Sequence, residues 1–262
     1  MIVKYAVTTV VGIALVWGVI RLFGWIEEKT RASFGVRAGL IGIGVILTAV
    51  GAYLGLFWAP PDRMMGDVQR IMYCHVPLLW NALIALCINF ACSVLYLIKP
   101  SWKTDSLAEA AAETGVVMGA NGVLLGAIWA KPTWGVWWTW DPRLIAAAIM
   151  LIAYAGYLAL RRFIEDPDRR ALWSSVVGIL VAVDLPVVWF AVRWFRSIHQ
   201  FQSSPSTVDP ALRVPLRVMA FAFLFLLMGF LWQRYRIALA HRKDEVALPD
   251  ALPTTARREV TP

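Results

Sequence analysis

Charged residues are scarce in this 262-residue sequence: Asp, Glu, Lys and Arg together make up only 16% of it. Hydrophobic residues make up 60%, and the mean hydropathy is +0.64. Because ordinary soluble domains are about 45–50% apolar and about 25% charged, this chain lacks the polar side chains that cover a soluble globule. The composition argues against a soluble enzyme and favours a membrane protein.

Cysteine motifs and nucleotide-binding motifs are also missing. The three cysteines, Cys74, Cys87 and Cys92, form no CxxC or CxxCH motif, which argues against a disulfide framework, a thiolate metal site and covalent c-type haem attachment. There is no Walker A motif, so any energy from ATP must come from a partner. The net charge of +8 would suggest nucleic acid in a soluble protein, but in a membrane protein it reflects basic cytoplasmic loops, so no nucleic acid is expected.

What the sequence does contain is a series of long apolar segments. A bilayer core of about 30 Å requires about 20 such residues in a helix. Seven segments qualify, two of them short: 1–23, 36–58, 76–98, 115–130, 144–160, 173–192 and 214–232. Because the backbone in lipid must satisfy its own hydrogen bonds, the predicted fold is an all-α polytopic membrane helix bundle in the lipid bilayer.

The two ends of the chain are predicted to differ from the rest. Residues 1–25 are expected to form a retained transmembrane helix rather than a cleaved signal peptide, since Arg21 lies near its far end and no A-x-A pattern follows. Residues 36–236 form the membrane domain. Residues 237–262 are charged and contain Pro249 and Pro253 without periodicity, which predicts a disordered cytoplasmic tail.

The distribution of cations predicts which connections lie in the cytoplasm. Sixteen of the 25 Lys and Arg residues lie in connections 21–37, 99–103 and 161–170 and in the tail from residue 234. The positive-inside rule places these segments in the cytoplasm. The outer face is then predicted to contain segments 59–75, 131–143 and 193–213.

Tryptophan is in excess, with 14 in total, and four of them fall within one outer segment, which reads WGVWWTWDPR from Trp134 to Arg143. An aromatic belt at the membrane surface requires one or two Trp per helix end. Four indoles in one connection therefore favour an apolar platform for a large planar ligand. Asp141 is expected to hold the loop by accepting N–H bonds, and Pro142 is expected to start the next helix.

Two of the three histidines, His75 and His199, fall on the same predicted face as this segment. Neutral imidazole is a common iron ligand, and haem requires axial nitrogen ligands and an apolar surround. The combination predicts a haem site with His75 and His199 as axial ligands, whereas a bare ion would leave the indoles unexplained. The third histidine, His241, is expected to be solvated in the tail.

Several other polar residues have weaker assignments. Haem carboxylates require cationic partners, and Arg70, Arg143, Arg193 and Arg196 lie on the outer side, although ordinary contacts with lipid phosphate are the better explanation for any one of them. Asp184 lies within an apolar segment and is expected to face the bundle interior beside a kink at Pro186. A role for Asp184 in proton or ligand movement is the alternative.

These motifs resemble those of the haem-handling proteins of cytochrome c assembly. The stretch WGVWWTWDPR resembles their Trp-rich WWD signature, and RIMYCHVP at 70–77 resembles the segment that carries the first external His of CcmC-type members. The stretches RWFRSIHQ at 193–200 and DPALRVPLR at 209–217 follow in the family order. The resemblance covers about residues 59–232.

The resemblance implies a six-helix core, with residues 1–25 as an extra transmembrane helix and 36–236 as the haem-handling domain. It implies a non-enzymatic protein that binds haem b transiently at the outer, periplasmic face of the bacterial inner membrane and presents it to the haem chaperone CcmE. The implied partners are the ABC transporter subunits CcmA and CcmB and the small membrane subunit CcmD. The implied haem contacts are Trp134, Gly135, Trp137, Trp138, Trp140 and Asp141, with His75 and His199 as iron ligands and Arg70 and Arg143 as possible propionate contacts.

Two other functions remain open at this point. The WDP sequence at Trp140–Pro142 also occurs in the related CcsA-like haem-lyase branch, which implies a cytochrome c synthase, although the RIMYCHVP stretch and the leucine after Arg143 favour the CcmC branch. A b-type electron-transfer subunit is the third class. Such a subunit normally buries its paired histidines on facing helices, whereas this pair is predicted at the membrane surface.

Overall fold

The computed structural model describes residues 18, 25, 33–199 and 209–251, with side chains described as far as 245. The helix predicted over residues 1–25 lies outside these residues, except for positions 18 and 25. The elements are α2 (Ser33–Tyr53), the π-helical turn η1 (Leu54–Trp58), the short 3-10 helix η2 (Asp67–Ile71), α3 (Met72–Ile98), α4 (Trp102–Trp134), α5 (Pro142–Phe163), α6 (Pro167–Val181), α7 (Asp184–Trp194) and α8 (Pro210–Ala251).

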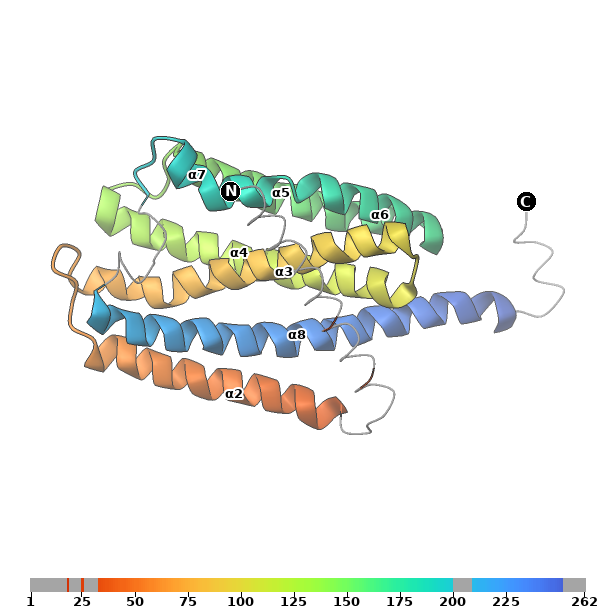
Figure 1. Ribbon diagram of the computed structural model, residues 1–262, viewed down its shortest axis with the longest axis horizontal. Coiled ribbons are helices and arrows are strands. Elements are labelled where there is room, and N and C mark those ends of the chain that lie inside the picture. Colours follow the sequence, from red (N-terminus) through yellow and green to blue (C-terminus); the bar gives the residue numbers. More distant parts are fainter. Residues whose placement is uncertain (1–17, 19–24, 26–32, 200–208, 252–262) are drawn as a thin grey trace.

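The described part of the chain is helical and contains no strand, and this confirms the predicted all-α polytopic fold. Six segments are long and apolar enough to cross a membrane: Ser33–Trp58, Asp67–Ile98, Trp102–Trp134, Pro142–Phe163, Pro167–Trp194 and Pro210–Glu245. Figure 1 shows these helices as a bundle with α3 and α4 at its centre. Helices α8 and α2 lie along one side of the central pair, and α5, α6 and α7 lie along the other.

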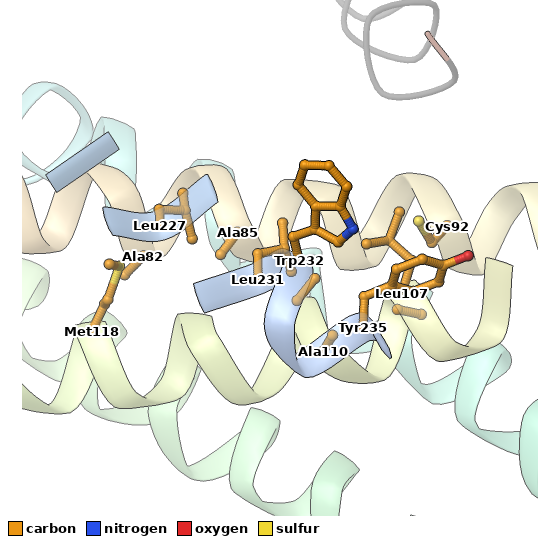
Figure 2. Packing of buried hydrophobic residues seen from close by; sticks show 12 residues of the cluster. Ala82, Ala85, Cys92, Leu107, Ala110, Met118, Leu227, Leu231, Trp232 and Tyr235 are labelled. Carbon is orange, nitrogen blue, oxygen red and sulfur yellow. The ribbon is translucent and has the colours of Figure 1, made fainter. Parts of the chain in front are cut away.

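Small residues allow the central helices to pack closely. Figure 2 shows Leu231, Trp232 and Tyr235 of α8 gathered with Ala85 of α3 and Ala110 of α4. Trp232 is only 1% exposed. Since lipid provides no hydrophobic driving force between helices, close contact through small residues supplies much of the packing energy. The core therefore lies between α3, α4 and α8.

The sixth predicted span, 173–192, is interrupted where the sequence predicted only a kink. Helix α6 ends at Val181 and α7 begins at Asp184, with a tight turn in which the Leu185 amide donates to the Ala182 carbonyl over 3.1 Å. Pro186 lies in the first turn of α7, where an amide has no partner within the helix, so proline costs little there. The proline is therefore compatible with a helix start and does not bend a continuous helix.

Helix α8 continues to Ala251, so residues 237–251 of the predicted disordered tail are helical, whereas residues 252–262 lie outside the described part of the chain. Arg242 on this extension donates to Asp168 of α6 over 2.5 Å, and Arg170 of α6 donates to Glu245 over 2.5 Å. Two of the charges that suggested a solvated tail, Arg242 and Glu245, are therefore paired with α6, and these pairs hold this part of α8 against the bundle.

Helix α4 is also much longer than its predicted span of 115–130. Its first half contains Asp105, Glu109 and Glu113, which ended the apolar segment in the sequence. Arg161 of α5 binds both oxygens of Asp105 at 2.8 and 3.0 Å and Glu109 at 3.0 Å. Because these carboxylates have partners within the bundle, a helix with acidic side chains remains packed there.

Candidate functional site

A cavity of about 130 Å³ opens at one end of the bundle, among α3, α4, α5, α7 and the segment after α7. It collects most of the residues that the sequence predicted as a site. The predicted residues that line the cavity are His75, Trp134, Trp137, Trp138, Arg143 and His199. The rest of the lining is mainly apolar and includes Trp80 and Trp129.

His75 lies in the first turns of α3 and is only 5% exposed. Its Nδ1 atom lies 2.8 Å from the Gly122 carbonyl oxygen on α4. A carbonyl can only accept, so Nδ1 carries the proton and donates it. The neutral ring then has its lone pair on Nε2, which is the arrangement that second-shell hydrogen bonds impose on metal-binding histidines.

The position of this ring depends on two neighbours on α4 that the sequence did not single out. Trp129 contacts the His75 ring edge to face, with centroids 5.6 Å apart. A Cβ atom at Gly126 would lie 2.7 Å from Cε1 of His75, so glycine is required for the close approach of the imidazole to α4. The one-turn spacing between Gly122, Gly126 and Ala130 was the available signal in the sequence.

His199 approaches the cavity from the segment that follows α7. Its ring lies edge to face with Trp134, with centroids 6.0 Å apart at 70°. Its backbone N–H donates to Ser197 Oγ over 3.0 Å. Residues 200–208 lie outside the described part of the chain. His75 is thus held within a helix, and His199 is held by a segment without regular structure.

Asp141 connects the Trp-rich loop to the His199 segment. Its carboxylate accepts from the Arg143 amide at 2.9 Å and so caps the start of α5, where Pro142 is the first residue, as the sequence predicted. The same carboxylate accepts from Ser197 Oγ at 3.1 Å and from the Ile198 amide at 2.9 Å. Asp141 is 6% exposed and does not line the cavity, so the geometry makes it a positioning residue.

The tryptophans of the loop divide into two groups. Trp134 is the last residue of α4, and Gly135 ends the helix in the left-handed conformation with φ of 79°. Trp134, Trp137 and Trp138 line the cavity. Trp140 is 82% exposed and contacts Trp138 edge to face at 6.5 Å, outside the lining. The exposed faces of Trp137 and Trp140 therefore extend the apolar surface beyond the cavity mouth.

The two arginines predicted to contact carboxylates lie in different places. Arg143 lines the cavity, and its Nη1 atom is buried without a hydrogen-bond partner. Arg70 lies outside the lining. It donates to the Gly55 and Ala59 carbonyls and forms an ion pair with Asp67 at 2.8 Å. Arg70 thus braces the turn after α2 against the start of α3.

Trp129 adds a second unpartnered donor, because its Nε1 atom is buried without a partner in the cavity wall. Buried donors without acceptors are costly, and in native proteins they often mark a missing ligand or water. The cavity therefore suits a planar ligand that carries a metal and carboxylate groups. It offers two imidazoles, a largely apolar wall rich in tryptophan and two unsatisfied donors.

Comparisons with known proteins identify similar chains. The family described as CcmC, heme exporter protein C, matches residues 19–248. Heme exporter protein C of Escherichia coli (strain K12) is 36% identical over 189 residues, which cover 70% of this chain and 75% of that protein. Heme exporter protein C of Bradyrhizobium diazoefficiens is 34% identical over 186 residues, 70% of each chain, and that of Paracoccus denitrificans is 31% identical over 218 residues, 81% of this chain and 90% of the relative.

Proposed function

Because this chain belongs to the heme exporter protein C family, we propose that it binds haem at the cavity and presents it to the haem chaperone CcmE during cytochrome c maturation. The observation that carries the proposal is that His75, His199 and the three tryptophans Trp134, Trp137 and Trp138 line one cavity. In this role haem is cargo, and the protein acts as a carrier and not as an enzyme.

The size of the cavity supports only partial enclosure of the macrocycle. Sites that enclose a drug-sized ligand usually measure about 300–1,000 Å³. At about 130 Å³ this cavity holds only part of haem in the observed conformation. The exposed indoles of Trp137 and Trp140 continue the apolar surface outward. A haem that rests partly outside stays within reach of an acceptor, which suits presentation.

The protein groups have distinct parts in this proposal. Haem iron, when bound, accepts two axial imidazoles. His75 presents Nε2 from a fixed ring on α3, and His199 supplies the second imidazole from a segment that Asp141 holds in place. Arg143 Nη1 and Trp129 Nε1 donate to the haem carboxylates. Release then requires displacement of His199 and its segment, while α3 keeps His75 in position.

The proposed location follows from the cation distribution. The cavity end of the bundle carries the cation-poor connections, so it lies at the periplasmic face of the bacterial inner membrane, and the C-terminus lies in the cytoplasm. The proposed partners are CcmE, the ABC transporter subunits CcmA and CcmB, and the small subunit CcmD. The ATP-hydrolysing step belongs to the transporter subunits, since this sequence has no Walker A motif.

The proposal is tested by the absorption spectrum of haem that co-purifies with the full chain. Replacing His75 and His199 together with Ala should abolish the bis-imidazole spectrum and most of the bound haem. His241→Ala is the matched control, because His241 lies on α8 at the other end of the bundle and should leave the spectrum unchanged. A bis-imidazole spectrum in the folded double variant would overturn the ligand assignment.

A further inference from the structure

Another cavity, of about 500 Å³, lies at the end of the bundle opposite the His75 site, among α4, α5, α6 and α8. Five arginines, among them Arg161 and Arg242, and five carboxylates, among them Asp105, line it. We name it the arginine cavity. Since one water molecule occupies about 30 Å³ in the liquid, this polar space has room for on the order of ten water molecules.

Two arginines of this wall carry buried donors. The side chains of Arg161 and Arg242 are each only 4% exposed. Their Nη atoms bind carboxylates, Asp105 in one case and Asp168 in the other. Within the described part of the chain, the Nε atom of each arginine has no hydrogen-bond partner. A buried donor is costly unless it finds an acceptor, and in a polar cavity an ordered water molecule is a common one.

Buried hydroxyl groups continue inward along α5 from the arginine cavity. Tyr157 lies one turn before Arg161, and Tyr154 lies about one turn further, so that Tyr154 is about 10 Å deeper than Arg161 at 1.5 Å per residue. Their ring centroids are 6.2 Å apart. Both hydroxyl groups are buried, and neither has a hydrogen-bond partner among the described residues.

Polar groups of α3 and α6 lie in the same part of the bundle, where these helices pack with α5 (Figure 1). Asn89 Oδ1, Ser93 Oγ and Ser174 Oγ are also buried, and the described residues offer them no hydrogen-bond partner. A Cβ atom at Gly178 of α6 would lie 2.5 Å from Ser93 Oγ and 3.2 Å from Asn89 Oδ1, so glycine allows the close approach of α3. The Tyr157 hydroxyl lies close to Asn89.

These polar groups form a row between α3, α5 and α6, which we call the oxygen row. Its members are all 0% exposed, and they are Asn89, Ser93, Tyr154, Tyr157 and Ser174. Unpaired polar groups are costly in a membrane bundle, and in native proteins such groups often mark a bound water molecule or another ligand.

Asp184, the first residue of α7, lies at the inner end of the oxygen row. Its Oδ2 atom is buried and has no hydrogen-bond partner in the part of the chain that the structure describes. The carboxyl group interacts electrostatically with Tyr154, and the next residue, Leu185, packs in the same apolar cluster as Tyr154. One turn further along α7, Val188 lines the His75 cavity together with Met150 of α5, and both are apolar. The oxygen row therefore stops about one turn short of that cavity.

We propose that the oxygen row binds a chain of internal water molecules, which connects the arginine cavity with Asp184. Water suits the row because each hydroxyl or amide oxygen requires a small partner that both donates and accepts. The chain solvates the Asp184 carboxyl from the cytoplasmic end, and this lowers the cost of a carboxyl group within the membrane. This inference does not depend on the proposed haem function.

X-ray radiolysis of the full chain in nanodiscs, followed by mass spectrometry, tests the chain of water molecules. Hydroxyl radicals form from bound water and modify the side chains beside it. Tyr154 and Tyr157 should be modified several-fold faster than Met219 and Trp232, which are 1% exposed and lie among apolar side chains. Thioether and indole groups react with these radicals at least as readily as phenols. Equal or slower modification of the two tyrosines would therefore show a dry interface and overturn the proposal.

Mixing the protein with water labelled with heavy oxygen just before radiolysis tests the connection to the arginine cavity. Water that exchanges with the bulk should leave heavy oxygen in the products of both Tyr154 and Tyr157. Products that contain only ordinary oxygen would show an isolated water pocket and contradict the connection.

Ser93→Ala/Ser174→Ala removes two oxygens of the row and should slow the modification of Tyr157 several-fold. The matched control is Thr48→Val/Thr114→Val, which also removes two hydroxyl groups. These donate to carbonyls of their own helices, α2 and α4, over 2.8 and 2.7 Å, outside the oxygen row. The control should leave the rates unchanged. An equal change in both double variants would show a general effect on the bundle and contradict the role of the oxygen row.

Discussion

At the scale of single residues, Asp141 shows how the structure changes the meaning of a motif. The sequence placed it among the haem contacts, and its position beside four tryptophans supports that assignment. In the structure its carboxylate receives bonds from the Arg143 amide, the Ser197 hydroxyl and the Ile198 amide, all of which are protein groups. The carboxylate therefore holds the loop and the His199 segment together, in line with the expectation that it accepts N–H bonds, and it does not line the cavity.

Asp141→Ala should release the His199 segment while His75 stays in place. The substitution removes the α5 cap, which costs about 1 kcal/mol, and the two bonds to Ser197 and Ile198. We expect ferric haem bound to this variant to lose its bis-imidazole spectrum and show a single imidazole ligand. Absorption and resonance Raman spectra of the purified protein measure this change.

Asp166→Ala is the matched control, because Asp166 caps α6 through the Arg169 amide at 2.6 Å, away from the His75 and His199 cavity. It should cost similar stability and leave the haem spectrum intact. If both variants gave the same spectrum as the wild type, Asp141 would not position His199.

The histidines and loop tryptophans could be predicted from the sequence because they are rare residue types gathered in neighbouring connections. Trp80 and Trp129 could not be predicted, since single tryptophans within apolar helices have no local signal that sets them apart. Gly126 was missed for a related reason: its role depends on the distance to the His75 ring, which belongs to another helix. The one-turn spacing of Gly122, Gly126 and Ala130 indicates a helix face suited to close packing, but it does not identify the His75 ring as the group that packs there.

At the scale of the elements, the sequence predicted the apolar centre of each described helix but missed several ends. Helices α4 and α8 both continue through charged residues that a hydropathy profile treats as loop or tail. Their charges pair with residues on α5 and α6, namely Arg161 with Asp105 and Arg242 with Asp168. The helices continue through these charges because the charges pair with residues on distant segments. A pattern within one segment does not show such pairs.

The Arg161 ion pairs supply a prediction about stability. Arg161 and Asp105 each have side chains that are 4% exposed, and Arg161 also binds Glu109. Arg161→Met would leave two carboxylates of α4 without their cation, and breaking a buried pair in this way costs about 3–5 kcal/mol. We expect a clearly lower midpoint of thermal unfolding in detergent.

Arg162→Met is the control, since the neighbouring arginine is exposed and should change the unfolding midpoint little. The triple variant Arg161→Met/Asp105→Leu/Glu109→Gln should recover much of the loss, because it removes the unpaired charges as well. A midpoint unchanged by Arg161→Met would mean that solvent reaches the pair and that it does not hold α4 to α5.

At the scale of the whole molecule, the two ends of the bundle differ in chemistry. One end carries the histidines, the Trp-rich loop and a mainly apolar cavity, and the other carries the ion pairs of Arg161, Arg170 and Arg242. The sequence predicted this polarity from the placement of cations among the connections. Presentation of haem to an external chaperone requires the histidine end to face outward, so the proposed function makes a claim about sidedness.

Cysteine labelling in spheroplasts tests this sidedness. In a background with Cys74, Cys87 and Cys92 replaced, Val136→Cys lies in the Trp-rich loop at a position 42% exposed, and Glu165→Cys lies in the exposed connection between α5 and α6. A membrane-impermeant maleimide should label the first in intact spheroplasts and the second only after lysis, because cation-rich connections stay in the cytoplasm. The reverse pattern would place the histidines on the cytoplasmic side. Haem binding could then survive, but presentation to a periplasmic chaperone could not.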